Sequence, residues 1–246
     1  FPNPFHLKFK IHKHEISYYT DLGHSWEEFY KSKISKKLIA DSRRQLRRLN
    51  EVGRVNFIVA KDTITKNNII QKMMDQKSRR FRETGYMDLF HISQFRDFYE
   101  KLTEIPLCSL DIHCSALTVD NVMIATHLGI IHNGTYYYLM PGYEGGDWMK
   151  YSAGRLLMEY LLEWSIKNGL KVFDFTIGSE PYKMKWCEKQ IDLYESVIPY
   201  SIKGSIYYLL FLGKVNFRQY PKLKNILITI REWVKIKIIQ GNVIKR

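Results

Sequence analysis

The chain has 246 residues, of which 45% are hydrophobic and 26% are charged. This composition is typical of a globular protein and excludes the disordered and fibrous classes. The longest apolar run, SIYYLLFLG, is far too short to span the ~30 Å hydrocarbon core of a membrane. The three cysteines lack metal-site spacing, so we expect reduced thiols in a cytoplasmic protein. Because the sequence begins with Phe1 and not with Met, we also expect that further sequence precedes it.

The formal net charge of +13 is distributed unevenly along the chain. Between Lys31 and Arg48, eight basic residues stand against one acid, and from Tyr200 onward ten basic residues stand against Glu232 alone. Such clusters favour an anionic partner: a phosphate-rich cofactor, a nucleic acid or the negative inner leaflet of a membrane. For each cluster the alternative is a solvated surface that keeps the protein soluble.

The first hundred residues predict three helices and one strand. A basic helix is expected over 31–53, a half-buried strand over 54–62, and a second helix over 66–83 that ends before Gly85. A third helix follows Ser93, which is a suitable N-cap. The residues expected to face the core from the first and third helices are Leu38, Leu46, Leu49, Val52, Phe95, Phe98, Tyr99 and Leu102.

The pattern changes after Pro106, where three strand signals follow one another. They are joined by Asp120-Asn121 and Asn133-Gly134, and Asn-Gly between apolar runs is a strong hairpin signal. We therefore predict an antiparallel meander. Beyond it we expect a long helix over 153–168, a strand over 171–176, a short helix and a last strand over 191–200.

The resulting order, β-β-β-α-β-α-β, is similar to that of the GCN5-related N-acetyltransferase (GNAT) core. The segment from Tyr151 to Trp186 resembles, more specifically, the acetyltransferase family related to cellulose-biosynthesis CelD and the BioF2-like domain. Upstream, SRRQLRRLNEVGRVNF resembles the basic helix of that family, whereas Ala153 stands where proline is usual. The matching positions of the main motif are Tyr151, Ser152, Gly154, Gly169, Leu170, Phe173, Asp174, Phe175, Gly178, Glu180, Pro181, Tyr182, Lys183 and Trp186.

This resemblance implies an α/β fold with a mixed (α+β) sheet: a GNAT-like acyl-CoA N-acyltransferase fold akin to the FemABX peptidyltransferases. It implies one complete and one partial GNAT-like unit. We assign residues 1–90 to the partial unit with the basic helix, 91–200 to the catalytic core, and 201–246 to a basic amphipathic helical tail.

The activity that the resemblance implies is transfer of an acyl group to an amine. The expected group is acetyl, and the donor is acetyl-CoA or another acyl-CoA. The acceptor would be an amino sugar or a polysaccharide or cell-envelope precursor, and no metal would take part. One alternative is a FemABX-like transferase that uses aminoacyl-tRNA, the only role we expect for nucleic acid in an enzyme of this kind. The other is a non-catalytic module that binds nucleic acid or an anionic membrane.

The donor's pyrophosphate is expected at the start of the helix near Ala153, because a helix N-terminus offers free N–H groups and partial positive charge. Gly142, Gly145 and Gly146 would allow close approach of the phosphates. An ordinary capped helix after a flexible loop is the alternative. The residues assigned to donor binding are Lys150, Tyr151, Ser152, Gly154 and Arg155.

Amide formation from a thioester requires a base for the ammonium nucleophile and an acid for the leaving thiolate. We assign the base to Asp174, whose pKa desolvation would raise, with Glu180 as the second candidate. Tyr182 is the assigned acid. The alternative is a structural ion pair between Asp174 and Lys183. The residues assigned to substrate binding are Lys183, Trp148 and Trp186.

The remaining signals concern histidines and the tail. His6, His12 and His14 resemble a string of metal ligands, but we expect no metal there. His113, His127 and His132 lie on the predicted meander, where a histidine facing the cleft could be catalytic and a core histidine is commoner. The tail has Ile226, Ile230, Trp233 and Ile236 at helical spacing, which suits either docking on the inner membrane surface or packing on the core.

Overall fold

The computed structural model describes residues 12–104, 110–178 and 180–218. Residues 16–191 form one compact unit, and residues 1–15 with 192–246 belong to a second. The strands are β1 (His12–Asp21), β2 (Val55–Val59), β3 (Asp111–Val119), β4 (Val122–His132), β5 (Thr135–Tyr143), β6 (Val172–Ile177) and β7 (Lys189–Glu195). The helices are α1 (Trp26–Lys33), α2 (Lys36–Asn50), α3 (Thr63–Thr84), α4 (Ser93–Lys101), α5 (Ala153–Lys167) and α6 (Ile202–Arg218), with short 3-10 helices η2 (Leu89–His91), η3 (Gly146–Tyr151) and η4 (Lys183–Lys185).

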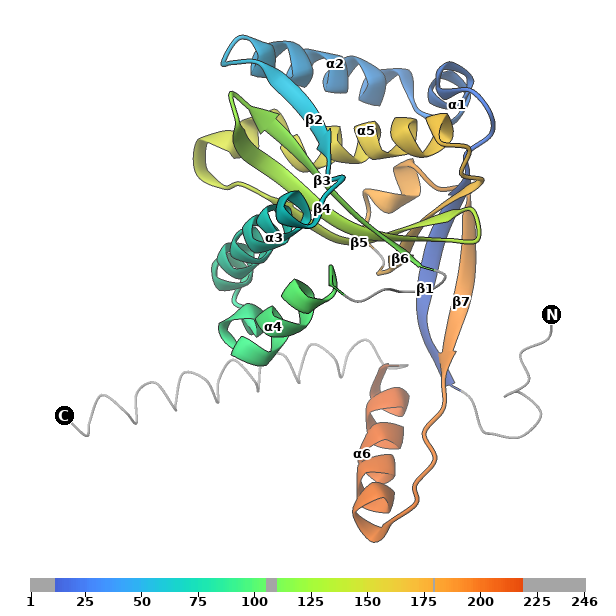
Figure 1. Cartoon of the computed structure of the whole chain (residues 1–246). Helices are drawn as coiled ribbons and strands as arrows, with labels where there is room; N and C mark the ends of the chain where they lie inside the picture. The colour runs from blue at the N-terminus through green and yellow to red at the C-terminus, as the bar shows by residue number, and fades with distance from the viewer. Residues whose placement is uncertain (1–11, 105–109, 179, 219–246) are drawn as a thin grey trace. The chain divides into compact units, whose positions relative to one another are not determined.

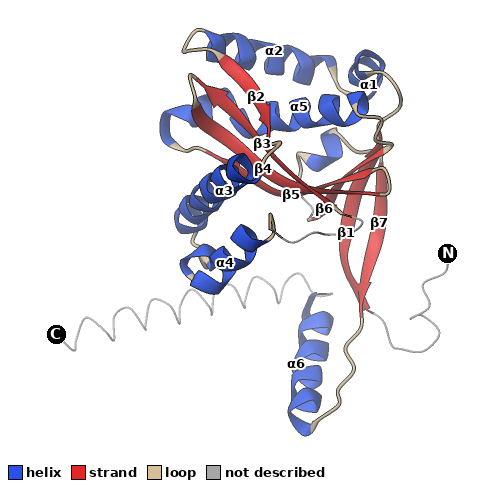
Figure 2. Ribbon diagram, viewed as in Figure 1, coloured by secondary structure: helices blue, strands red, loops and turns tan. Residues whose placement is uncertain are grey.

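Seven strands of the described chain form one sheet in the order β2-β3-β4-β5-β6-β1-β7 (Figure 1). The pairs β2–β3, β3–β4, β4–β5 and β1–β6 are antiparallel, whereas β5 and β6 run parallel. Helices cover both faces of this sheet (Figure 2). The mixed α/β class expected from the sequence is therefore confirmed.

The meander of β3, β4 and β5 forms as the turn residues predict. Asp120 and Asn121 have φ of 46° and 72°, and Asn133 and Gly134 have φ of 47° and 73°. Two successive left-handed residues are the requirement of the tight hairpin turn whose twist matches the flanking strands. Local sequence alone therefore accounts for these two connections.

Two hydrophobic clusters lie on opposite faces of the sheet because side chains alternate along each strand. On β3, Leu117 and Val119 belong to the cluster that packs against α5, whereas Cys114 and Ala116 belong to the cluster that packs against α3. Helices α3 and α5 each bury one face in these clusters, since Ile69, Ile70, Met73, Met74, Leu156, Leu157 and Leu161 are at most 2% exposed.

The single basic helix predicted over 31–53 is wrong, because the chain breaks it into α1 and α2. Ile34 adopts an extended conformation, and Ser35 caps α2 by accepting a hydrogen bond from the Leu38 N–H at 3.3 Å. A serine that caps a helix offers the backbone an alternative to continuing the preceding one. Val52, expected in the core, lies beyond the end of α2 and is 49% exposed.

The stripe predicted for α4 is only half correct. Ser93 is the first helical residue and Ile92 occupies the cap position. Tyr99 and Leu102 pack against the α3 cluster, as expected. Phe95 and Phe98, however, are 41% and 56% exposed, because the cluster under α4 already holds Phe90.

Strand β1 has no counterpart in the sequence prediction. Its residues HKHEISYYTD mix charged and aromatic side chains without regular alternation, so the period-two signal of a half-buried strand is weak. The strand nevertheless lies between β6 and β7, where its neighbours supply the pairing. Only the sheet, and not the local sequence, determines this element.

The chain after residue 200 begins with a helix, α6, as expected. The four tail residues Ile226, Ile230, Trp233 and Ile236 lie outside the described residues, so membrane docking by the tail stays a prediction. Among the helices that the structure describes, none is long and apolar enough to cross a membrane.

We expect Ile69→Ala to lower the free energy of unfolding by about 2–5 kcal/mol, because Ile69 is fully buried under the sheet and the change leaves a cavity. Ile64→Ala is the matched control on the same helix, since Ile64 is 75% exposed. It should change stability by at most about 0.5 kcal/mol. Equal effects of the two substitutions in urea unfolding would contradict the placement of α3.

Candidate active site

The site begins where two parallel strands stop pairing. The pairs between β5 and β6 run from Thr135–Val172 to Tyr137–Asp174. Both strands continue, β5 to Tyr143 and β6 to Ile177, without further pairs between the two in the described chain. The two strands therefore diverge after Asp174.

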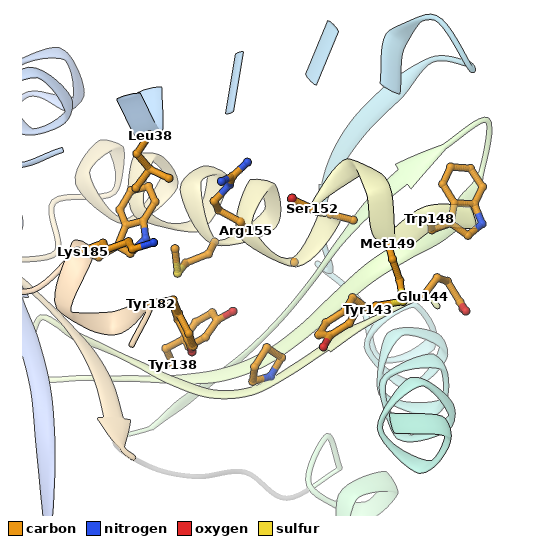
Figure 3. Close-up of a pocket in the computed structure, with 15 residues that line it drawn as sticks. Leu38, Tyr138, Tyr143, Glu144, Trp148, Met149, Ser152, Arg155, Tyr182 and Lys185 are labelled. Carbon is orange, nitrogen blue, oxygen red and sulfur yellow. The ribbon is translucent and has the colours of Figure 1, made fainter. Parts of the chain in front are cut away.

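A cavity of about 470 Å³ lies at this divergence on the α5 side of the sheet (Figure 3). Its floor is β5, its roof is the first two turns of α5, and η3 and η4 close its two ends. Most of the lining is apolar or aromatic, with a few polar groups. The lining residues are Leu38, Tyr138, Pro141, Tyr143, Glu144, Trp148, Met149, Ser152, Ala153, Gly154, Arg155, Met158, Tyr182, Lys185 and Trp186.

The N-terminus of α5 faces this cavity without a side-chain cap. Ser152 precedes the helix in the left-handed region, with φ of 54°, and its carbonyl accepts from the N–H groups of Arg155 and Leu156 at 3.0 and 3.2 Å. In the described chain the N–H groups of Ala153 and Gly154 have no backbone acceptor. Free N–H groups with the positive end of the helix dipole form an arrangement that binds phosphate.

Three of the five residues assigned to donor binding line the cavity. These are Ser152, Gly154 and Arg155. Tyr151 is instead buried, with the Arg48 guanidinium 5.4 Å and the Lys150 ammonium 5.2 Å from its ring centre. Tyr151 and Lys150 therefore support the loop from behind and do not form the wall.

Two of the three loop glycines serve packing. A Cβ on Gly142 would lie 2.7 Å from Gln76 Oε1, and one on Gly145 would collide with the Arg79 guanidinium. Arg79 also donates to the Tyr143 carbonyl at 2.5 Å, which ties α3 to the end of β5. Close approach of α3, and not of a ligand, therefore explains these two glycines.

Tyr182, Trp186 and Trp148, all assigned to the site from the sequence, line the cavity. In Figure 3, Tyr182 lies at the end of the cavity away from Trp148. Burial raises the pKa of the Tyr182 phenol, and the nearby Glu180 and Cys187 add to this, although the residue is 37% exposed as a whole. Burial also raises the pKa of Tyr138 well above its ordinary value. Both phenols are consequently neutral at physiological pH.

Sequence reasoning missed several wall residues. Tyr138 lies on a predicted strand whose inward face was not assigned, and Lys185 lies two residues from the assigned Lys183. Leu38 comes from α2, which is distant in sequence. The alternation of side chains along β5 could have indicated Tyr138, whereas no local signal indicates Leu38.

Asp174 and Glu180 are not among the residues that line the cavity. Asp174 lies on the face of β6 opposite to the buried Phe173 and Phe175, as its position between them predicts. Its Oδ1 accepts hydrogen bonds from Ser17 Oγ and from the Thr176 N–H, both at 2.7 Å. The side chain of Glu180 is 55% exposed and projects toward solvent.

Lys183 is buried, with a side chain only 4% exposed. Its ammonium donates to the Ile177 carbonyl at 2.7 Å and contacts the Thr176 carbonyl at 3.4 Å. It also pairs with Glu180 Oε2 at 3.0 Å, so the structural ion pair considered as the alternative forms with Glu180 and not with Asp174. Protein oxygens thus use all three ammonium donors, which holds the turn after β6 and supports a positioning role for this lysine.

His113 and His127 lie inside the core. The Tyr136 hydroxyl lies 2.9 Å from His113 Nδ1 and 3.0 Å from His127 Nδ1, and the three residues are at most 4% exposed. Burial lowers the pKa of both imidazoles, to about 4 for His113. No group of three or more His, Cys, Asp and Glu side chains able to hold a metal ion occurs in the part of the chain that the structure describes.

Comparison with known families and structures places this geometry in context. A family model described as an acetyltransferase (GNAT) domain matches residues 36–184. No curated protein matches the sequence.

Several solved structures share the fold at low identity. The crystal structure of FemX matches with a TM-score of 0.57 and 10% identity over 80% of this chain and 64% of that one. A conserved protein of unknown function from Bacteroides thetaiotaomicron VPI-5482 matches with a TM-score of 0.50, 11% identity, and coverage of 76% and 61%. The C-terminal domain of a putative lysylphosphatidylglycerol synthetase from Agrobacterium fabrum has a TM-score of 0.50, 12% identity, and coverage of 76% and 60%. The chain thus spans less than two thirds of each of these structures, and identities this low show the fold alone.

Lys183→Met should lower stability markedly, because it removes a buried ammonium that three protein oxygens use. Loss of a buried charged donor costs about 1–3 kcal/mol or more for the acceptors left unpaired. Lys150→Met is the matched control, since Lys150 is exposed, and it should shift the thermal midpoint little. An unchanged midpoint in Lys183→Met would contradict the positioning role.

His113 gives the stability a pH dependence whose direction can be stated. Because burial lowers its folded-state pKa to about 4, below the ordinary ~6.5, neutral His113 contributes stability above pH ~6.5. That contribution is lost as the pH falls toward 4, with a slope of about 1.4 kcal/mol per pH unit where the unfolded state holds one more proton.

Urea unfolding between pH 7 and pH 5 measures this slope. His113→Gln should make it shallower, whereas His24→Gln, at an exposed loop residue, should leave it as in the unchanged protein. His127 acts in the same direction, so part of the slope should remain in His113→Gln. A slope unaffected by His113→Gln would disprove the assignment.

Proposed function

Because the chain belongs to the acetyltransferase (GNAT) domain family, we propose that it transfers an acyl group from acyl-CoA, acetyl-CoA in the first instance, to an amine. We propose an amino sugar or a polysaccharide or cell-envelope precursor as the acceptor. The observation that carries the proposal is the cavity where β5 and β6 diverge, bounded by the uncapped N-terminus of α5.

The lining of this cavity fits an acyl-CoA donor. Phosphates would be held by the free N–H groups of Ala153 and Gly154 and by Arg155, at the start of α5. The apolar wall between β5 and α5, which includes Met158 and Trp186, would hold the less polar arm and exclude water from the reacting atoms. When bound, the donor supplies an activated thioester.

Tyr182 is proposed as the acid for the leaving thiolate. It lines the cavity, and its raised pKa keeps the phenol protonated. The low-dielectric surroundings that raise the pKa of the phenol also raise the proton affinity of a thiolate beside it, so proton transfer between them is not opposed by that shift. The phenol would donate first a hydrogen bond and then the proton.

Asp174 is proposed as the base that takes the proton from the acceptor amine. Its carboxylate lies on the other face of β6, at the point where pairing with β5 ends. Both of its hydrogen bonds from Ser17 and Thr176 reach Oδ1, which leaves Oδ2 to accept a proton. Acid and base would then approach the thioester from opposite sides of the gap between the strands. Glu180 remains the second candidate.

An aminoacyl-tRNA donor is the second candidate for this site. The exposed basic side chains of α2, among them Lys36, Arg43 and Arg47, favour a polyanion. Such a complex would depend steeply on salt, because each neutralised phosphate releases counterions. An acyl-CoA complex, with few phosphates, would depend on salt much less.

Calorimetric titration with acetyl-CoA and CoA tests the donor. We expect saturable binding of both at 0.15 M salt and no tighter, salt-sensitive binding of tRNA. No heat with either acetyl-CoA or CoA would refute the proposal. Salt-dependent binding of tRNA alone would favour the aminoacyl-tRNA alternative.

Tyr182→Phe tests the acid. It should lower kcat by about 10²–10⁴-fold, the range for a positioned general acid, with little change in acetyl-CoA affinity. The rate is measured as thiol release from acetyl-CoA in the presence of a panel of amino sugars. Tyr86→Phe is the matched control, because Tyr86 is 70% exposed and outside the cavity. An unchanged kcat in Tyr182→Phe would remove that residue from the mechanism.

A further inference from the structure

A second cavity, of about 580 Å³, lies between α2 and the first turn of α5. It shares three wall residues with the first cavity: Leu38, Arg155 and Lys185. Figure 3 shows these three at the end of the first cavity away from Trp148. The two spaces therefore adjoin, and one extended ligand can occupy both.

The walls of the second cavity are strongly basic. Lys37, Arg44, Arg155 and Lys185 line it and Asp41 is the one acid among its lining residues, which gives 4 − 1 = +3 for these side chains. Within the described chain, neither the Lys37 ammonium nor the Lys185 ammonium has a hydrogen-bond or ion-pair partner. Several cations line this cavity, and the carboxylates around it do not neutralise all of them, so the cavity favours an anion.

Asp41 fixes two of these cations in place. It pairs with Arg44, and its Oδ2 accepts from Arg155 Nη2 at 2.6 Å. The hydrogen bond from Arg155, helped by Arg44, lowers the pKa of the Asp41 carboxyl, so the carboxyl is ionised at neutral pH. A guanidinium has five donors, and one contact with Asp41 leaves others for a ligand.

The N-terminus of α2 adds to this positive field. Its cap residue Ser35 lines the cavity, and the first turn of this 15-residue helix contains no acid. Acidic residues usually occupy this place because they stabilise the helix dipole. In α2 the basic residues Lys36 and Lys37 occupy it instead, so the negative charge that would complement the dipole is missing from the helix itself.

We propose that the cavity between α2 and α5 is a phosphate-binding site that receives a phosphate group of the donor whose thioester end lies in the adjoining cavity. Arg44, Arg155, Lys37 and Lys185 hold the phosphate, and Asp41 positions the two guanidinium groups. For the identity of the donor this inference rests on the proposed function. It adds α2 to the elements that bind the donor, whereas the site predicted from the sequence contains no residue of α2.

Calorimetry with CoA, 3′-dephospho-CoA and inorganic pyrophosphate tests the site. In the unchanged protein, CoA should bind at least tenfold more tightly than 3′-dephospho-CoA. In the double variant Lys37→Gln/Arg44→Gln this difference should disappear, while the affinity for 3′-dephospho-CoA stays within twofold. Arg47→Gln on the same helix is the control, because Arg47 is exposed and does not line the cavity, and it should keep the full difference.

Asp41→Asn separates a built site from simple attraction by net charge. It removes a negative charge, so attraction alone would tighten the binding of CoA. Because Asp41 holds two guanidinium groups in position, we expect CoA binding to weaken at least threefold instead. Tighter binding in Asp41→Asn would overturn the assignment of a built site.

The remaining outcomes distinguish this inference from the proposed function. Equal affinities for CoA and 3′-dephospho-CoA in the unchanged protein, or a difference that survives in the double variant, would overturn the inference and leave the proposed function standing. If neither nucleotide binds, the proposed donor fails. Pyrophosphate binding that the double variant abolishes would then still support a phosphate site, and absence of pyrophosphate binding would overturn it as well.

Discussion

The divergence of β5 and β6 is the constraint on which the rest of the site depends. Parallel pairing ends at Tyr137–Asp174, so the backbone groups beyond that point must find other partners or remain unpaired inside the protein. Side chains supply them. Thr176 Oγ1 donates to the Tyr138 carbonyl at 3.1 Å, and Lys183 donates to the Ile177 carbonyl at 2.7 Å.

The polar residues around the end of β6 therefore do two things: they pair with backbone groups where the strands diverge, and their turn places side chains in the cavity. Asp174 and Lys183 satisfy backbone groups that the diverging strands release, which makes the gap between the strands stable. The same turn carries Tyr182 and Trp186 into the cavity that the gap opens. Lys183 therefore holds the turn that carries these two side chains, although it does not line the cavity itself.

Charge is arranged around the gap on the α5 side. The N-terminus of α5 and the basic side chains of α2 lie next to each other because α2 packs against η3 and α5. Asp41 of α2 links the two helices through Arg155 of α5, and it also pairs with Arg44 of its own helix, so one carboxylate contacts both guanidinium groups. Arg155, one of the side chains proposed to bind the phosphate, is thus also one that joins the two helices.

The sequence by itself determined the elements whose signals are local. The turns at Asp120-Asn121 and Asn133-Gly134, the buried stripes of α3 and α5, and the opposite orientation of Asp174 and its two phenylalanine neighbours depend on nearby residues alone. Its motif also contains Tyr182 and Trp186, which line the cavity in the structure. Only the tertiary structure decided which residues meet across long separations. Strand β1 and the junction of α2 with α5 arise from pairing and packing between distant segments, whose energies no local pattern contains.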